Sequence, residues 1–122
     1  NEMRGIGGVF FDYLDGNDDR HNKLTRSVGR AFLKAYIPIV KRRRGEEYTD
    51  SDKAFQAIRR GRYIEFNLVY DRGTLFGLKS NARAESILCS MPPHATFIYN
   101  YDPQPDTPQS EMMKYYKPRK YC

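Results

Sequence analysis

Apolar and polar side chains alternate most regularly over residues 63–70, where one face carries Ile64, Phe66, Leu68 and Tyr70. A period of two places successive side chains on opposite faces of an extended chain, so this segment predicts a half-buried strand. The sequence DRGT at 71–74 favours a hairpin turn, and residues 75–78 predict the returning strand. We expect further short strands at 7–14 and 95–101, which are rich in bulky apolar and aromatic residues.

A different spacing dominates residues 20–43. Apolar positions recur there at intervals of three and four, at Leu24, Val28, Ala31, Phe32, Leu33, Tyr36, Ile39 and Val40. This spacing predicts a long amphipathic helix. Pro38 predicts a kink, or an end of the helix near Tyr36. The basic run 41–44 then follows at the helix C-terminus, where the macrodipole favours cations.

Three shorter helices are also expected. The polar residues 49–52 provide N-caps for a helix over 51–60, with Phe55 and Ile58 buried and Gly61 ending it. A helix over 84–91 ends before two prolines, and Thr107 or Ser110 caps a last helix that runs to Tyr116. The order of strands and helices predicts an α+β fold with an antiparallel sheet.

Composition narrows the class of protein. The 122 residues suffice for one modest domain, and the abrupt start at Asn1 leads us to expect a cut through a longer protein. A net charge of +6 favours anionic partners. The sequence contains neither an apolar run of about 18 residues nor a signal-peptide pattern at its start. Cys89 lies in an apolar run and is expected to be a core thiol, which suggests a reducing compartment.

Several kinds of chemistry are excluded by spacing. The glycines at 5–8 precede a predicted strand and do not form a dinucleotide fingerprint, and no Gly-x-Ser-x-Gly elbow occurs. His21 and His94 lack neighbouring ligands at metal spacing, so we assign no metal ligand to this chain. The segment 60–66 resembles the basic-Gly-aromatic strand of an RNA-binding sheet, but Phe66 is expected to be buried rather than stacked on bases.

Arginines flank the predicted strands and turns, at positions 4, 59, 60, 62, 72 and 83. The planar guanidinium binds carboxylate or phosphate in a bidentate manner, so these residues favour a multi-anionic small molecule over RNA. In the alternative interpretation, each arginine is a solvated charge or pairs with Asp12, Glu65, Asp71 or Glu85. Both interpretations stay open from the residues alone.

A series of motifs runs along the whole chain: RGIGGVFFD (4–12), GRAF (29–32), YIPIV (36–40), RRGRY (59–63), EFNLVYDRGT (65–74), FGL (76–78), Arg83, ESIL (85–88), Ser90 and Pro118-Arg119. Together these motifs resemble the oxygen-dependent coproporphyrinogen III oxidase family. The resemblance covers nearly the whole chain and corresponds to the C-terminal part of the family's enzyme, under half of its length. It implies that residues 1–122 are the C-terminal portion of one domain, whose fold is a large antiparallel sheet flanked by helices.

The resemblance also implies an activity in haem biosynthesis. The family's homodimeric enzyme converts two propionates of coproporphyrinogen III to vinyl groups, yielding protoporphyrinogen IX, with molecular oxygen as co-substrate and no organic cofactor. Its catalytic histidine and a proposed catalytic aspartate lie upstream, as do histidines that hold a metal in some members. No catalytic residue is therefore assigned here, and the fragment alone is expected to be inactive.

A few roles are implied for residues of this chain. The family's substrate loop aligns with Asn81, Ala82 and Arg83, of which Arg83 is the expected propionate anchor, and Arg4 is a second candidate. Residues 63–97 align with the dimerisation region. Leu75 departs from the family's pattern, which has lysine there.

Two other functions remain as alternatives: a non-catalytic dimerising or scaffolding fragment, and a basic RNA-binding module. The cytoplasm is the expected location, with the mitochondrial intermembrane space as the alternative. Any targeting segment would precede Asn1.

Overall fold

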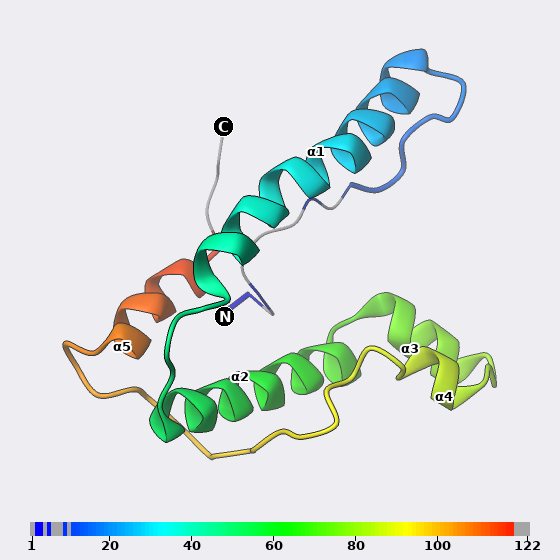
Figure 1. Ribbon diagram of the computed structural model, residues 1–122. Coiled ribbons are helices and arrows are strands. Elements are labelled where there is room, and N and C mark those ends of the chain that lie inside the picture. Colours follow the sequence, from blue (N-terminus) through cyan, green and yellow to red (C-terminus); the bar gives the residue numbers. More distant parts are fainter. Residues whose placement is uncertain (1, 4, 6–8, 10, 119–122) are drawn as a thin grey trace. The chain divides into compact units, whose positions relative to one another are not determined.

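The computed structural model describes residues 2–3, 5, 9 and 11–118, and within these residues it contains helices and no strand (Figure 1). The elements are α1 (Asp19–Arg43), α2 (Asp50–Val69), α3 (Arg72–Lys79), α4 (Ala84–Ile87), α5 (Pro108–Met113) and the 3-10 helix η1 (Lys114–Tyr116). The chain divides into two compact units. Unit 1 comprises Asn1–Ile6 with Thr49–Cys122, and unit 2 comprises Gly7–Tyr48.

The predicted α+β fold with a large antiparallel sheet is therefore wrong for the described residues. The segment 63–70 was expected to be a strand, but residues 63–69 lie in α2 with Tyr70 as its C-cap, and residues 75–78 lie in α3. Residues 95–101 form no strand, and the prediction at 7–14 lies partly outside the described residues. A strand needs a hydrogen-bonded neighbour, and once 63–78 is helical the expected partners are gone.

Helix α1 confirms the long amphipathic helix predicted over 20–43. Asp18 caps it, accepting a 2.9 Å hydrogen bond from the backbone N–H of Arg20 and a 2.7 Å contact from the Arg20 guanidinium. These bonds, the guanidinium first, lower the pKa of Asp18. Pro38 lies inside the helix, which does not end near Tyr36. None of the α1 side chains is buried among the described residues.

Helix α2 begins where the sequence predicts it and continues nine residues further than the predicted end at Arg60. Thr49 and Asp52 form a capping box: the Asp52 N–H donates to Thr49 Oγ1 at 3.2 Å, and the Thr49 N–H donates to Asp52 Oδ2 at 2.9 Å. Once this first turn is formed, each further residue gains one hydrogen bond and costs the conformational entropy of only one residue, so the helix extends easily. Gly61 costs a helix only about 1 kcal/mol, and no proline occurs between positions 38 and 92, so nothing stops the helix there.

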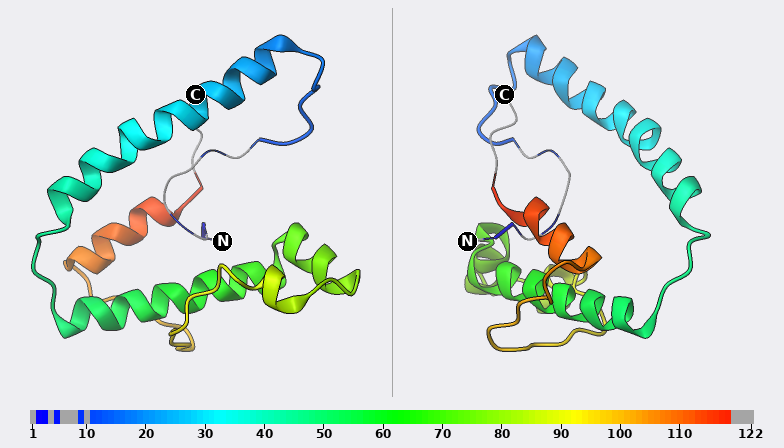
Figure 2. Two further views of the ribbon diagram at one scale, coloured as in Figure 1. Left: turned by 45° about the vertical axis from the view of Figure 1, so that its right-hand side comes forward. Right: turned by 90° about the vertical axis from the view of Figure 1, so that its left-hand side faces the viewer.

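Helices α3 and α4 form a short helical pair at the C-terminal end of α2 (Figures 1 and 2). Asp71, expected in a hairpin turn, is the N-cap of α3 and accepts a 2.8 Å hydrogen bond from the Thr74 N–H. Aspartate favours both settings, because its short carboxylate bonds backbone N–H groups two or three residues ahead. Gly77 allows the two helices to approach, since a Cβ there would lie 2.9 Å from Ile87 Cδ1. Helix α4 ends four residues before the predicted 91.

The core of unit 1 lies between α2 and the C-terminal part of the chain. Its buried apolar side chains are Phe55, Ile58 and Tyr116, so the two core positions predicted on the second helix are confirmed. The Phe55 and Tyr101 ring centroids lie 6.3 Å apart. Thr107 caps α5 through a capping box with Ser110, as expected. Cys89, by contrast, is exposed, and its assignment as a core thiol is wrong because α4 ends before it.

Gly61 marks the closest approach between α2 and the extended segment 95–99. A Cβ on Gly61 would lie 2.3 Å from the carbonyl oxygen of Thr96, and the Thr96 N–H donates to the Ala57 carbonyl at 2.9 Å. This contact needs glycine for space rather than for backbone conformation.

We expect Gly61→Ala to destabilise unit 1 by about 1–3 kcal/mol, because a backbone carbonyl must move away. Chemical denaturation followed by circular dichroism measures this change. Gly29→Ala is the matched control: a Cβ there meets nothing within 4 Å in the described part of the chain. Alanine should raise the stability of α1 by about 0.5–1 kcal/mol. Equal effects at the two glycines would contradict the close approach.

Candidate anion-binding site

The predicted substrate loop is a tight connection between α3 and α4. Asn81 has a left-handed backbone with φ 57°, which asparagine tolerates better than most residues. The Ala82 N–H donates to the Gly77 carbonyl at 3.1 Å, and Ser80 Oγ bonds the same carbonyl at 3.1 Å. The loop backbone is thus fixed by local bonds, while residues 80–83 are exposed to solvent.

Arg83 is the cationic group of this loop. It is the N-cap residue of α4, with its side chain 76% exposed. Its Nη2 and Nε atoms donate to Glu85 Oε2 at 2.7 and 3.2 Å. This pairing is the one that the alternative interpretation expected. Since the pair is exposed, its strength is modest, and an incoming carboxylate can compete for the guanidinium.

The structure describes three of the four predicted substrate-binding residues. Asn81, Ala82 and Arg83 are adjacent in the loop, whereas Arg4 lies outside the described residues. The cavities beside Arg62 and beside Arg59 are lined by other residues. The candidate site is therefore an exposed, preformed loop rather than an enclosed cleft.

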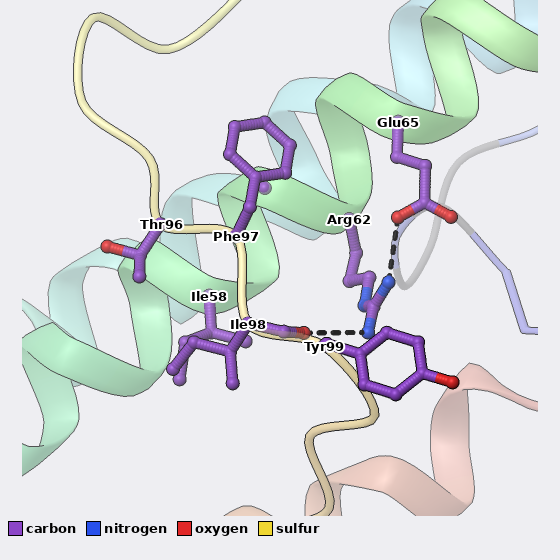
Figure 3. A pocket seen from close by; sticks show the side chains of 8 residues that line it. Ile58, Arg62, Glu65, Thr96, Phe97, Ile98 and Tyr99 are labelled. Atoms are coloured by element: carbon purple, nitrogen blue, oxygen red, sulfur yellow. Dashed lines mark hydrogen bonds and ion pairs between the residues drawn. The ribbon is translucent and has the colours of Figure 1, made fainter.

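A second cationic position lies on α2, beside the extended segment 95–99. There a cavity of about 340 Å³ is lined by Ile58, Gly61, Arg62, Glu65, Thr96, Phe97, Ile98 and Tyr99. Figure 3 shows Arg62 held from both sides: Nη1 donates to Glu65 Oε2 at 2.7 Å and Nη2 donates to the Ile98 carbonyl at 3.3 Å. These bonds fix the segment against α2 and leave Arg62 a structural role.

The sequence did not reveal how Arg59 differs from the other arginines. Its side chain is 11% exposed, against 32% for Arg62 and 76% for Arg83. Its ion-pair partner, Glu2, is 57 positions away, so no local pattern could indicate the contact. The one local signal was that Arg59 follows Phe55 by four positions, which places both on the same face of a helix.

In the part of the chain that the structure describes, no group of three or more His, Cys, Asp or Glu side chains is placed to share a metal ion. Likewise, none of the described helices is both long and apolar enough to cross a bilayer.

The chain was compared with models of protein families. The model described as Coproporphyrinogen III oxidase matches residues 1–121, and so covers nearly the entire sequence. This family consists of oxidoreductases of haem biosynthesis whose substrate is coproporphyrinogen III. A match of this extent makes the family assignment independent of any single arginine. The chain belongs to the coproporphyrinogen III oxidase family.

Proposed function

We propose that this chain is the C-terminal portion of an oxygen-dependent coproporphyrinogen III oxidase, and that it binds substrate and forms the dimer contact. The family match over residues 1–121 is the observation that carries this proposal. The net charge of +6 adds support, because the substrate carries four carboxylates.

The proposed reaction removes CO2, the carboxyl hydrogen and one carbon-bound hydrogen from each of two propionic acid arms. For each arm, –CH2–CH2–COOH and O2 give –CH=CH2, CO2 and H2O2, so oxygen accepts the two electrons and two protons that the arm loses. No organic redox cofactor is needed for this balance. The groups that move the protons belong, in this proposal, to the remainder of the enzyme.

Within this scheme the loop 81–83 holds a propionate. Arg83 presents a planar guanidinium at the start of α4, on a backbone fixed by the bond between Ala82 and Gly77. A propionate that replaces Glu85 on the Nε and Nη2 edge would form two parallel hydrogen bonds. The loop then contributes position and charge, and leaves the chemistry to other residues.

Exposed apolar side chains support a dimer face within 63–97. Several large side chains of this stretch remain exposed in the described chain: Leu68, Val69, Tyr70, Phe76, Leu78 and Phe97. Their exposed fractions range from 40% at Leu78 to 73% at Phe76. Large exposed apolar side chains are typical of surfaces that another chain covers where they adjoin one another. We propose that a second copy covers it.

Oxygen dependence is tested with the assembled enzyme, meaning this chain together with the rest of the oxidase. Under air, coproporphyrinogen III should yield protoporphyrinogen IX with consumption of two molecules of oxygen per substrate. Under nitrogen, turnover should stop, and readmitted oxygen should restore it. Undiminished anaerobic turnover would contradict the oxygen-dependent assignment. The 122-residue chain alone should show no turnover, and activity there would contradict its role as a portion.

A further inference from the structure

Arg59 is held in an unusual position on α2. Its guanidinium carbon lies 4.1 Å from the centroid of the Tyr116 ring, and Tyr116 itself is buried. The flat guanidinium therefore rests on an aromatic face, which fixes its plane and screens it from water. The Met113 sulfur lies 3.6 Å from Arg59 Nη1 and covers part of the guanidinium.

The hydrogen bonding of this buried cation is incomplete. Nη1 donates to the two Glu2 carboxylate oxygens at 3.2 and 3.3 Å. Nε and Nη2 are buried and find no acceptor within the described part of the chain. Buried N–H groups normally have a partner, and the Nε and Nη2 pair is an edge that binds carboxylates in a bidentate manner. The edge suited to a carboxylate is thus unoccupied, while Glu2 contacts the other nitrogen.

A cavity of about 360 Å³ adjoins Arg59. Phe55, Met112 and Tyr116 supply apolar walls, and Gln56, Gln109 and Asp52 supply polar ones. Its volume is near the lower end for small-molecule sites, so it suits one ring with its side arm rather than a whole tetrapyrrole.

Charge within the cavity is asymmetric. Asp52 accepts hydrogen bonds from the Thr49 backbone N–H and from Gln109, and these bonds, the Thr49 one first, lower its pKa. It lies seven residues before Arg59, roughly 10 Å along the helix axis. A ligand with one carboxylate at Arg59 and an uncharged far end fits this arrangement, whereas a second carboxylate beside Asp52 would be repelled.

We propose that the Nε and Nη2 edge of Arg59 and this cavity bind a carboxylate carried on a short arm of an apolar ring, and that the Glu2 carboxylate on Nη1 weakens this binding by its charge. The inference rests on the proposed function, since the propionate arms of the substrate have this chemistry. Glu2 contacts one guanidinium nitrogen only, and its side chain is 36% exposed. Because Nε and Nη2 are covered, ligand binding includes movement of the groups around them.

The probe for this site is 3-phenylpropionate, titrated into the 122-residue chain while arginine Nε–H signals are followed by NMR. A saturable shift of the Arg59 signal is expected. The amide 3-phenylpropanamide has the same shape without the charge and should cause no such shift. Glu2→Gln removes the competing charge and should tighten binding about fivefold or more. Arg59→Lys keeps the charge but loses the fork, and should weaken binding about tenfold or more.

Three results would overturn the site: equal binding of the amide, unchanged affinity in Arg59→Lys, or unchanged affinity in Glu2→Gln. The Glu2 variant alters a partly exposed side chain, so it stays informative if the Arg59 variant misfolds, which circular dichroism detects. If phenylpropionate binds at Arg59 but the assembled enzyme does not convert coproporphyrinogen III, the proposed function is contradicted and this site is supported. Conversion without Arg59 binding would sink this site alone.

Discussion

Replacing Arg83 with alanine is expected to raise the KM for coproporphyrinogen III of the assembled enzyme by roughly tenfold to a hundredfold. Arg83 lies at the end of a loop whose backbone is fixed by its own hydrogen bonds. The substitution therefore removes the charge and the hydrogen bonds of the guanidinium without changing the loop conformation. Hydrogen bonds to charged groups contribute about 1.5–3 kcal/mol, and every 1.4 kcal/mol corresponds to about a factor of ten. Steady-state kinetics of protoporphyrinogen formation measures the change.

Three further variants separate anchoring from general charge. Lys79→Ala removes an exposed cation from the end of α3 and should leave KM within about twofold. Arg83→Lys keeps the charge without the fork and should lie between wild type and alanine. Glu85→Gln frees the guanidinium from its 2.7 Å partner and should lower KM. If kcat/KM is unchanged in Arg83→Ala, Arg83 is no anchor.

Replacing Phe55 with alanine should destabilise unit 1 by about 3–5 kcal/mol, which is the usual range for a buried phenylalanine. Phe55 is 8% exposed, and its ring lies 6.3 Å from that of Tyr101, so its loss opens a cavity between α2 and the C-terminal part. Domains of this size are stable by only about 5–15 kcal/mol, so the loss is a large fraction of the total. Urea denaturation followed by circular dichroism at 222 nm provides the measurement.

Tyr99 is the matched control for that experiment. It lies in the same unit, outside the proposed dimer face, with 98% of its surface exposed, so Tyr99→Ala should change the free energy of unfolding by no more than about 0.5 kcal/mol. A comparable loss at both positions would show that the core described between α2 and the C-terminal part does not stabilise unit 1.

Helix starts were predictable from the sequence because their cause is local. Thr49 with Asp52, and Thr107 with Ser110, satisfy the first N–H groups of a helix within four residues, and both predictions are confirmed. The existence of α1 was predictable because its apolar spacing persists over many turns, whereas the end near Tyr36 that Pro38 suggested was wrong.

The segment 63–70 shows where such reasoning fails. Its alternation matches a strand over only eight residues, a length at which periodicity alone cannot separate strand from helix. The deciding contact is not local: Gly61, just before the segment, lies against Thr96, 35 positions further along the chain. Nothing in the eight residues themselves indicates that partner.

In the candidate site, too, local contacts were predictable from the sequence and long-range contacts were not. The alternative interpretation named Glu65 and Glu85 among the possible partners of the arginines, and the structure pairs them with Arg62 and Arg83, two or three residues away. Arg59 could not be singled out, since Glu2 and Tyr116 are both 57 positions away. The family assignment succeeded because it depends on motifs spread along the chain rather than on secondary structure.

Helix α1 has a consequence for cooperativity. With none of its side chains buried among the described residues, its hydrogen bonds rest on the Asp18 cap, the cations of its last turn and intrinsic propensity. A helix stabilised in this way unfolds gradually with temperature rather than in an all-or-none transition. Its stability also depends on ionic strength, because charged side chains lie at both of its ends. A single melting temperature would therefore describe the packed helices of unit 1 and fail to describe α1.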